Sequence, residues 1–502
     1  MTGTMDARKI LSGLGWSTFA TAVAAACQIA FMAVLARMLE PAAFGLMAMA
    51  AMALRFAGYF SQLGFAQALV QRSRLEAQDT TAALLMALGL GTAMYLAMVL
   101  AAPLFARLLR ATELAPLIDV LGASLLLGPL AGLPLALLRR QARFKRVNAI
   151  EVCAYVSGYG AVGIGCAAHG MGVWSLVAAA LSQQALLLVL GFMALRYPLC
   201  WPVQRSAYAR LWHFGSRYSL VSFLEFLGGN IETLLVGRAF GKGELGLLNR
   251  ASTLTNLPVE LGVSAVNKVL FPALAGMQHD RPRMADGFQM LLLSVGIFSS
   301  TLACGISAAA PDVVALLLGS RWAAIVPLVA ILALAVPPTF MFVACGVTLD
   351  SLAALGPKLR LQSLMLGVKM ALLIALMRWN LEGVACAVLL TEVLRLALGL
   401  RLVGRLLEIP LAHLRQMLLL VAAAGGAVWC AVAAMQAASH AAGLPLIARV
   451  PLESIAGSLA IAGALLLLAI RCPHYGPLQR FEAIRLWHAR LMALVQPRGA
   501  LP

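Results

Sequence analysis

The sequence predicts an all-α polytopic membrane protein of about fourteen transmembrane helices, in two pseudo-symmetric six-helix lobes followed by two C-terminal helices. Composition is the first reason, because hydrophobic residues make up 62% of the chain and charged residues only 12%, against roughly 25% charged in soluble domains. The mean hydropathy of +0.90 over 502 residues agrees. An internal repeat, in which residues 36–46 resemble residues 237–247, predicts the two lobes.

The two copies of this repeat lie 201 positions apart, far more than the roughly 20–50 residues of a solenoid unit. Three residue pairs are identical in register: Arg37 and Arg238, Gly45 and Gly246, and Leu46 and Leu247. Membrane transporters are often built from two related lobes with the substrate site between them. The repeat therefore predicts a transporter.

Apolar runs of about 20 residues are long enough to cross the hydrocarbon core of a membrane. Fourteen runs are expected to do so: 13–36, 43–69, 81–103, 116–138, 148–168, 172–195, 212–236, 246–272, 288–310, 323–348, 361–378, 381–403, 415–437 and 450–471. They define an N-terminal lobe, a C-terminal lobe, a pair of added spans and an amphipathic tail at the cytoplasmic face: 1–196, 197–409, 410–472 and 473–502.

The basic residues of the loops predict the orientation. With the N-terminus in the cytoplasm, 24 Lys and Arg residues fall in loops inside and nine in loops outside, Arg250 among the nine. This asymmetry agrees with the positive-inside rule for an even number of spans and two cytoplasmic termini. The formal net charge of +18 therefore concerns membrane orientation, and no nucleic-acid partner is expected.

Five basic residues remain inside the spans, namely Arg55, Arg217, Lys268, Lys369 and Arg395. A charge at mid-span that faces lipid costs roughly 2.5–3.5 kcal/mol, so Arg55 and Lys369 are expected to face a cavity or an acid. Arg395 has Glu392 one turn before it, which allows a structural ion pair. Arg217 and Lys268 lie near the cytoplasmic face and either snorkel or receive an anionic substrate.

Embedded acids form the second group of candidate site residues. Glu225 and Glu232 are seven positions apart and so share a helix face, Glu260 follows Pro258, and Glu151 opens the fifth span. Embedded carboxylates in transporters bind protons or sodium, or pair with basic residues. Both alternatives stay open for these four residues.

The sequence offers no candidate catalytic residues and no candidate metal site. The Gly158–Gly163 stretch matches G-x-G-x-x-G but lies inside a span, where small residues predict close helix contact and not a dinucleotide site. The nine cysteines and seven histidines lack metal-ligand spacing. We therefore expect neither a cofactor nor a metal nor a catalytic residue.

Three stretches carry a resemblance to a known family: Leu138–Arg146; Leu247–Ala251 with Leu257–Pro258 and Val269–Leu274; and Leu318–Trp322 with Pro327–Leu328. They resemble the polysaccharide branch of the multidrug/oligosaccharidyl-lipid/polysaccharide exporter (MOP) superfamily, and within it the Wzx-type lipid-linked oligosaccharide flippases. Two positions depart from that pattern, because Leu248 stands where Tyr is frequent and Glu232 where Asp is commoner.

The resemblance implies two six-helix lobes around a central cationic cavity, in the bacterial inner membrane. It implies a flippase that moves oligosaccharide repeat units on undecaprenyl diphosphate from the cytoplasmic to the periplasmic leaflet, for exopolysaccharide, capsule or O-antigen. The five embedded basic residues would bind this substrate, and its polyprenyl chain would lie in a groove beside the last two spans. Expected partners are this substrate and membrane lipids, with a polysaccharide polymerase and a chain-length regulator as candidates.

Three alternatives are weighed against this function. A MATE-type drug/cation antiporter shares the lobes but usually has twelve spans and fewer basic residues in its lumen. A flippase for peptidoglycan lipid precursors has fourteen spans, and the motifs favour it less. A membrane-bound polymerase or glycosyltransferase would need a large periplasmic loop, whereas the longest outside loop is under about twenty residues. The sequence therefore favours a transporter that is not an enzyme.

Overall fold

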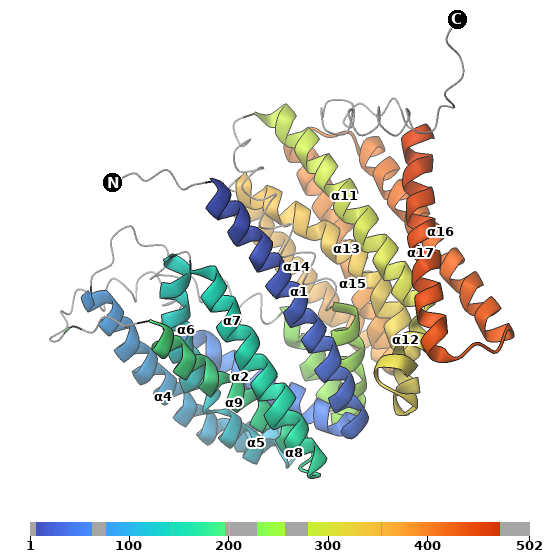
Figure 1. The fold of residues 1–502 in the computed structure, drawn as a ribbon. Helices are drawn as coiled ribbons and strands as arrows, with labels where there is room; N and C mark the ends of the chain where they lie inside the picture. Colours follow the sequence, from blue (N-terminus) through green and yellow to red (C-terminus); the bar gives the residue numbers. More distant parts are fainter. Residues whose placement is uncertain are drawn as a thin grey trace, which may run out of the picture. The chain divides into compact units, whose positions relative to one another are not determined.

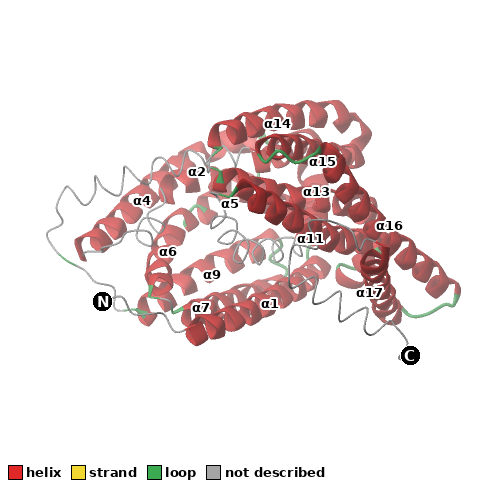
Figure 2. Ribbon diagram, turned by 90° about the horizontal axis from the view of Figure 1, so that it is seen from above, coloured by secondary structure: helices red, strands yellow, loops and turns green. Residues whose placement is uncertain are grey.

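The structure is a computed structural model in which residues 7–62, 77–141, 143–195, 200, 228–256, 280–352 and 354–471 are described. Helices and short connections account for all of this part (Figure 1 and Figure 2), which contains no strand. The predicted all-α membrane fold is confirmed. The expected amphipathic tail, 473–502, lies outside the described residues.

The chain forms two compact units. Unit 1 comprises Met1–Arg250 with Leu317–Arg321, and unit 2 comprises Ala251–Leu316 with Trp322–Pro502. The predicted lobe boundaries at residues 196 and 409 stay predictions.

Unit 1 is built around α2 and α9 in its described part. Its labelled helices are α1 (Ala7–Met38), α2 (Pro41–Gln62), α4 (Ala77–Leu108), α5 (Leu114–Leu121), α6 (Ser124–Arg140), α7 (Phe144–Tyr155), the π-helix η1 (Val156–Gly163), α8 (Ile164–Ala168) and α9 (Val173–Ala194). Residues 228–256 are helical as well. Helix α9 packs against α6, α7 and η1, while α2 packs against α4 and α5. Alanine and leucine dominate the buried core between α4, α6 and α7, as small and branched side chains allow close packing.

The described part of unit 2 consists of helices and short connections. Its labelled helices are α11 (Arg281–Ala308), α12 (Ala310–Leu317), the 3₁₀ turn η2 (Ser320–Ile325), α13 (Val326–Ser351), α14 (Leu355–Leu376), the 3₁₀ turn η3 (Met377–Trp379), α15 (Asn380–Leu406), α16 (Leu411–Ala441) and α17 (Leu446–Arg471). Helix α13 packs between α11 and α15, and α11 also packs against α16, which packs against α17. A large buried cluster of unit 2 joins α11, α13, α14, α15 and α16.

The described residues contain ten helical stretches that are long and apolar enough to cross a membrane. One of them, Gly356–Leu406, comprises two expected spans, 361–378 and 381–403, on either side of η3. Much of the expected spans 212–236 and 246–272 lies outside the described residues. The total of fourteen spans therefore stays a prediction.

Candidate functional site

The two copies of the sequence repeat touch each other in unit 1. A Cβ atom on Gly45 would lie 1.7 Å from the Lys242 carbonyl oxygen, and a Cβ atom on Gly246 would lie 1.8 Å from the Pro41 carbonyl oxygen. Pro41 and Lys242 are themselves 201 positions apart, as are the two glycines. The contact is therefore reciprocal about a local two-fold axis, and only glycine allows the two backbones to approach this closely. The two copies of the repeat thus meet in register at this crossing.

Charged repeat residues fix the crossing at its edge. Arg238 Nη1 donates to the Leu108 carbonyl oxygen at 2.5 Å, where the C-terminus of α4 leaves its carbonyls without helical partners. Lys242 forms an ion pair with Glu113, in the turn between α4 and α5. The hydrogen bond from Lys242, together with a backbone hydrogen bond, holds the pKa of the Glu113 carboxyl below its usual value.

The glycine crossing positions a stacked guanidinium. Arg250 lies one turn after Gly246, and Phe44 directly precedes Gly45. The guanidinium carbon of Arg250 lies 4.3 Å from the centroid of the Phe44 ring, which is within the range of a cation–π interaction. Arg250 Nη2 donates to Asn249 Oδ1 at 2.9 Å, while its buried Nε has no acceptor among the described residues.

Aromatic side chains stack beside this guanidinium. The ring centroids of Tyr155 and Tyr159 are 4.9 Å apart, and those of Phe31 and Tyr155 are 5.9 Å apart. The charge of Arg250 acts on both tyrosine hydroxyls. Tyr159 belongs to the π-helix η1, a local distortion that is frequent at functional sites. Unit 1 therefore places one cation and an aromatic stack together.

The glycines of η1 serve helix packing, as the sequence predicts. A Cβ atom on Gly158 would lie 2.8 Å from the Gln183 Cβ, one on Gly160 would lie 2.7 Å from the Phe31 ring, and one on Gly163 would lie 3.0 Å from the Ala179 Cβ. All three positions therefore need a small residue for contact with α9 or α1. The interpretation of this motif as close helix contact is confirmed.

Unit 2 carries a second stacked guanidinium, on α15. Arg395 Nη2 lies 2.6 Å from Glu392 Oε2, and Thr339 Oγ1 on α13 donates to the same carboxylate oxygen at 3.0 Å. The Arg395 guanidinium carbon lies 4.4 Å from the centroid of the Phe342 ring. The ion pair allowed by the one-turn spacing is thus formed, while the buried Arg395 Nε has no acceptor among the described residues.

The other embedded basic residues have contrasting surroundings. Lys369 on α14 is only 9% exposed, beside Val368, which packs on the large cluster of unit 2. Arg55 is exposed on α2, and the described residues give it no ion pair. Arg217 and Lys268 lie outside the described residues.

Two of the four candidate acids lie in the described part. Glu151 on α7 forms an ion pair of 2.5 Å with Arg139 at the end of α6. Glu232 is half-buried within helical residues 228–256. Glu225 and Glu260 lie outside the described residues. The part assigned to these acids in ion coupling stays a prediction.

Comparison with known proteins gives the family. A family model described as polysaccharide biosynthesis protein matches residues 34–327, which is more than half of the chain. The chain belongs to the polysaccharide biosynthesis protein family. It is 26% identical over 325 residues to the lipopolysaccharide biosynthesis protein WzxC of Escherichia coli (strain K12), covering 64% of this chain and 66% of WzxC. It is 28% identical over 345 residues to the succinoglycan biosynthesis transport protein ExoT of Rhizobium meliloti (strain 1021), covering 66% and 67%. The match thus spans about two thirds of these relatives.

Solved structures share the fold of this polysaccharide biosynthesis protein. The lipid II flippase MurJ in an inward closed conformation matches with a TM-score of 0.70 at 11% identity, over 90% of this chain and 99% of MurJ. A multidrug resistance MATE transporter of the MOP superfamily, in an inward-facing conformation, matches with a TM-score of 0.57 at 18% identity, over 76% and 93%. The chain therefore has the helical fold of these membrane transporters.

The surroundings of Arg250 were not predicted from the sequence of this family member. The loop assignment places Arg250 outside the spans, whereas the structure places it within a helix. The repeat register contained the signal, because Gly246 is the repeat equivalent of Gly45 and Arg250 follows it by one helical turn.

Proposed function

We propose that this protein is a flippase that moves undecaprenyl-diphosphate-linked oligosaccharide repeat units from the cytoplasmic to the periplasmic leaflet of the bacterial inner membrane. Its family, and its similarity to the lipopolysaccharide biosynthesis protein WzxC and the succinoglycan biosynthesis transport protein ExoT, support this proposal. The protein acts as a multi-pass transporter and not as an enzyme. Both termini lie in the cytoplasm, as the positive-inside rule favours.

One observation carries the assignment of substrate chemistry. Arg250 and Arg395 each stack on a phenylalanine ring, and each keeps a buried Nε without an acceptor among the described residues. A buried N–H group without an acceptor destabilises the protein until an oxygen accepts a hydrogen bond from it. Phosphate and carboxylate oxygens match the planar guanidinium. A diphosphate or an acidic sugar would supply such oxygens.

The aromatic stack of unit 1 suits the sugar part of the substrate. The apolar faces of sugar rings pack on aromatic rings, and tyrosine adds a hydroxyl that hydrogen-bonds. We assign Phe31, Tyr155 and Tyr159 to this contact, with Arg250 beside them. Arg55, Lys369 and Arg395 provide further positive charge, with Arg217 and Lys268 at the cytoplasmic entry. Transport proceeds by alternating access, as in other transporters with repeated lobes.

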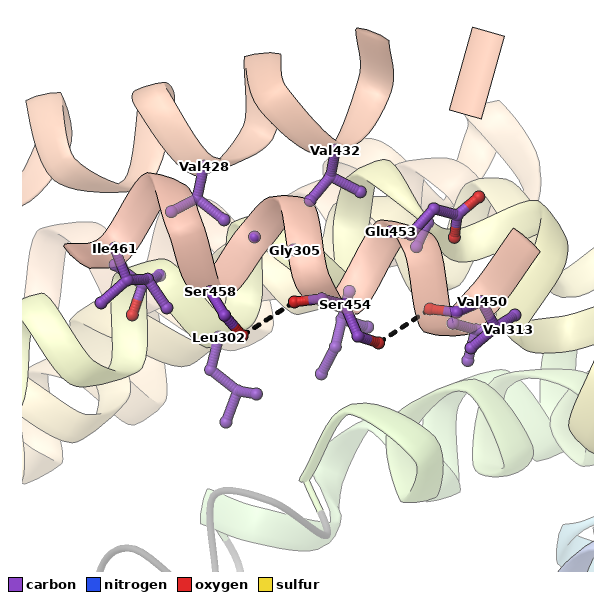
Figure 3. Close-up of a pocket in the computed structure, with 14 residues that line it drawn as sticks. Leu302, Gly305, Val313, Val428, Val432, Val450, Glu453, Ser454, Ser458 and Ile461 are labelled. Atoms are coloured by element: carbon purple, nitrogen blue, oxygen red, sulfur yellow. Dashed lines mark hydrogen bonds between the residues drawn. The ribbon is translucent and has the colours of Figure 1, made fainter. Parts of the chain in front are cut away.

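An apolar cavity in unit 2 offers room for part of the polyprenyl chain. Its volume is about 280 Å³, and it is lined by α11, α16 and α17, including Leu302, Gly305, Val428 and Val432 (Figure 3). These helices include the last two expected spans, where the resemblance implies a groove for the polyprenyl chain. Gly305→Phe should fill the cavity and slow export, whereas Gly89→Phe, at an exposed glycine of α4 with open space around it, should not. Equal export by both variants would remove the cavity from the path.

The decisive experiment is deletion of the gene followed by analysis of polyprenyl-linked glycans. Complete repeat units that accumulate in the cytoplasmic leaflet, with loss of surface polysaccharide, are expected, and their mass identifies the sugar. Complementation with Arg250→Gln should fail, while Arg250→Lys should restore part of the export. Normal polysaccharide with higher sensitivity to cationic compounds would indicate a drug antiporter instead. Accumulated peptidoglycan precursors would indicate a flippase for those lipids.

Deletion of the expected partners gives a further test. A polysaccharide polymerase and a chain-length regulator would use the translocated repeat units in the periplasmic leaflet. Loss of the polymerase should leave single repeat units in the periplasmic leaflet, and loss of the regulator should change the polymer length, whereas loss of this protein should leave single repeat units in the cytoplasmic leaflet.

A further inference from the structure

Four titratable or charged side chains meet at one end of the apolar cavity of unit 2. They come from three elements: Asp312 from α12, His440 from the last turn of α16, and Arg449 and Glu453 from α17. None of them belongs to the candidate substrate residues described above. Figure 3 shows Glu453 at this end of the cavity, near Val432 and Val450.

Three of these residues form a chain of contacts. Arg449 Nη1 lies 2.8 Å from His440 Nδ1, and His440 Nε2 lies 3.2 Å from Asp312 Oδ2. Arg449 Nη1 also lies 3.8 Å from Asp312 Oδ1, and its Nε donates to the Leu444 carbonyl oxygen at 2.6 Å. Arg449 Nη1 lies 3.1 Å from His440 Nε2 as well, so Asp312, His440 and Arg449 form one compact group of contacts.

Glu453 is the unusual member of the cluster. It is 2% exposed, and both of its carboxyl oxygens are buried without a donor among the described residues. Glu453 follows Arg449 by one turn of α17, so the two share a helix face, and Val313, the neighbour of Asp312, lines the same cavity as Glu453. The nearby hydroxyls of Ser454 and Ser458 donate to backbone carbonyls of their own helix, at 2.8 Å each (Figure 3). They therefore do not serve as donors to Glu453.

Charge counting shows what the cluster lacks. Arg449 lies within ion-pair distance of Asp312, whereas Glu453 has no donor among the described residues. Its ionised form would therefore be a buried like charge near Asp312. An ionised carboxylate that is buried without donors is strongly unfavourable, and Glu453 lines a cavity whose other walls are mostly apolar. One proton between the two carboxyl groups removes the excess charge and supplies the missing hydrogen bond.

We propose that Asp312 and Glu453 form a proton-binding site that holds one shared proton, with His440 and Arg449 as its neighbours. The proton joins α12 to α17 at the end of the cavity. Its release leaves two carboxylates facing each other, which weakens the contact of α17 with α12 and opens this end of the cavity. The site concerns the protein alone and does not depend on the transported compound.

Infrared spectroscopy of the purified full-length protein tests the proposal directly. A carbonyl band of a protonated carboxylic acid is expected in the wild type at neutral pH, and it should disappear when the pH is raised. Glu453→Gln and Asp312→Asn should each lose this band. Glu382→Gln, which removes an exposed carboxylate from the first turn of α15, should keep it. A band that persists in both cluster variants, or its absence from the wild type, would overturn the proposal.

Unfolding measurements give an independent readout of the same proton. The folded protein binds one proton more than the unfolded chain at neutral pH, so its stability should decrease as the pH rises. The unfolding constant should change by up to about tenfold per pH unit while the pair titrates. Glu453→Gln should lose this dependence and resemble the wild type at lower pH, because the amide donates to Asp312 in place of the shared proton.

Sodium is the control ligand. Addition of sodium chloride at constant pH and constant ionic strength, with potassium chloride as the reference, should leave the stability of the wild type unchanged. A sodium-specific increase that Glu453→Gln abolishes would show a metal cation in the site and would refute the proton assignment. A pH dependence equal in wild type, Glu453→Gln and Asp312→Asn would also refute it.

Discussion

Replacement of Gly45 by alanine is expected to separate two helices in unit 1. The new Cβ atom would lie 1.7 Å from the Lys242 carbonyl oxygen, whereas ordinary contact begins near 3.4 Å, so the oxygen must retreat by about 1.7 Å. The opposing atom is a backbone atom, which a change of rotamer cannot move. Overpacking of this kind costs about 3 kcal/mol, and the higher helix propensity of alanine returns about 1 kcal/mol. We expect a net loss of about 2 kcal/mol.

Gly89→Ala is the matched control. Gly89 lies on α4 in the same unit, is exposed, and has no atom near the position of a new Cβ. The same substitution there should stabilise the protein by up to about 1 kcal/mol through helix propensity alone. The free energy of unfolding is measured by SDS titration of both variants in mixed micelles. The two substitutions should therefore change stability in opposite directions.

The reciprocal geometry makes a sharper prediction for the double variant. Gly246→Ala alone should cost about as much as Gly45→Ala, because its Cβ would meet the Pro41 carbonyl oxygen at 1.8 Å. Once one alanine has separated the helices, the second meets less resistance, so the double variant should cost at least about 1 kcal/mol less than the sum. Strict additivity, or a Gly45→Ala variant as stable as Gly89→Ala, would refute the crossing.

Three further predictions concern charges. Because the pKa of Glu113 is below its usual value of 4.5, its pairing with Lys242 stabilises the protein at neutral pH and is lost as the pH falls through that lowered pKa. Glu113→Gln should therefore lower stability by at most about 1 kcal/mol at pH 7. In thermal scans its melting temperature should also fall less steeply than that of the wild type as the pH is lowered. An equal fall in both proteins would contradict the pairing. Glu392→Gln should destabilise the protein by about 1–3 kcal/mol, because it leaves Arg395 as a half-buried unpaired charge. The double variant with Arg395→Gln should recover part of the lost stability, since no unpaired charge remains. A double variant less stable than Glu392→Gln would argue against the ion pair. Arg55→Ala should abolish polysaccharide export at normal membrane abundance, and wild-type export would exclude Arg55 from the substrate path.

The fold was predictable because hydropathy reports membrane burial directly. Each expected span in the described part coincides with a helical stretch, including those interrupted by short irregular turns, such as Leu114–Arg140 and Phe144–Ala168. The π-helix η1 was not predictable, because its glycines resemble ordinary packing positions in sequence. Composition thus determines which residues cross the membrane, while local distortions depend on tertiary contacts.

The candidate site was predictable only where partners lie close in sequence. The Arg395–Glu392 pair follows from one helical turn of spacing, and the structure forms it. The Arg250–Phe44 stack joins residues more than 200 positions apart, and the Asp312–His440 contact joins residues 128 positions apart. No periodicity or spacing rule relates such residues, so their meeting depends on the packing of whole helices.

The surroundings of the embedded charges also rank them as functional candidates. Arg395 is compensated by Glu392 and Phe342, so its retention already has a structural reason. Arg55 is exposed and has no ion pair among the described residues, although a lipid-facing arginine at mid-span costs roughly 2.5–3.5 kcal/mol. A charge that is costly and that forms no ion pair with the described residues is best explained by a function outside folding. Arg55 is therefore the charge whose removal should separate export from stability most cleanly.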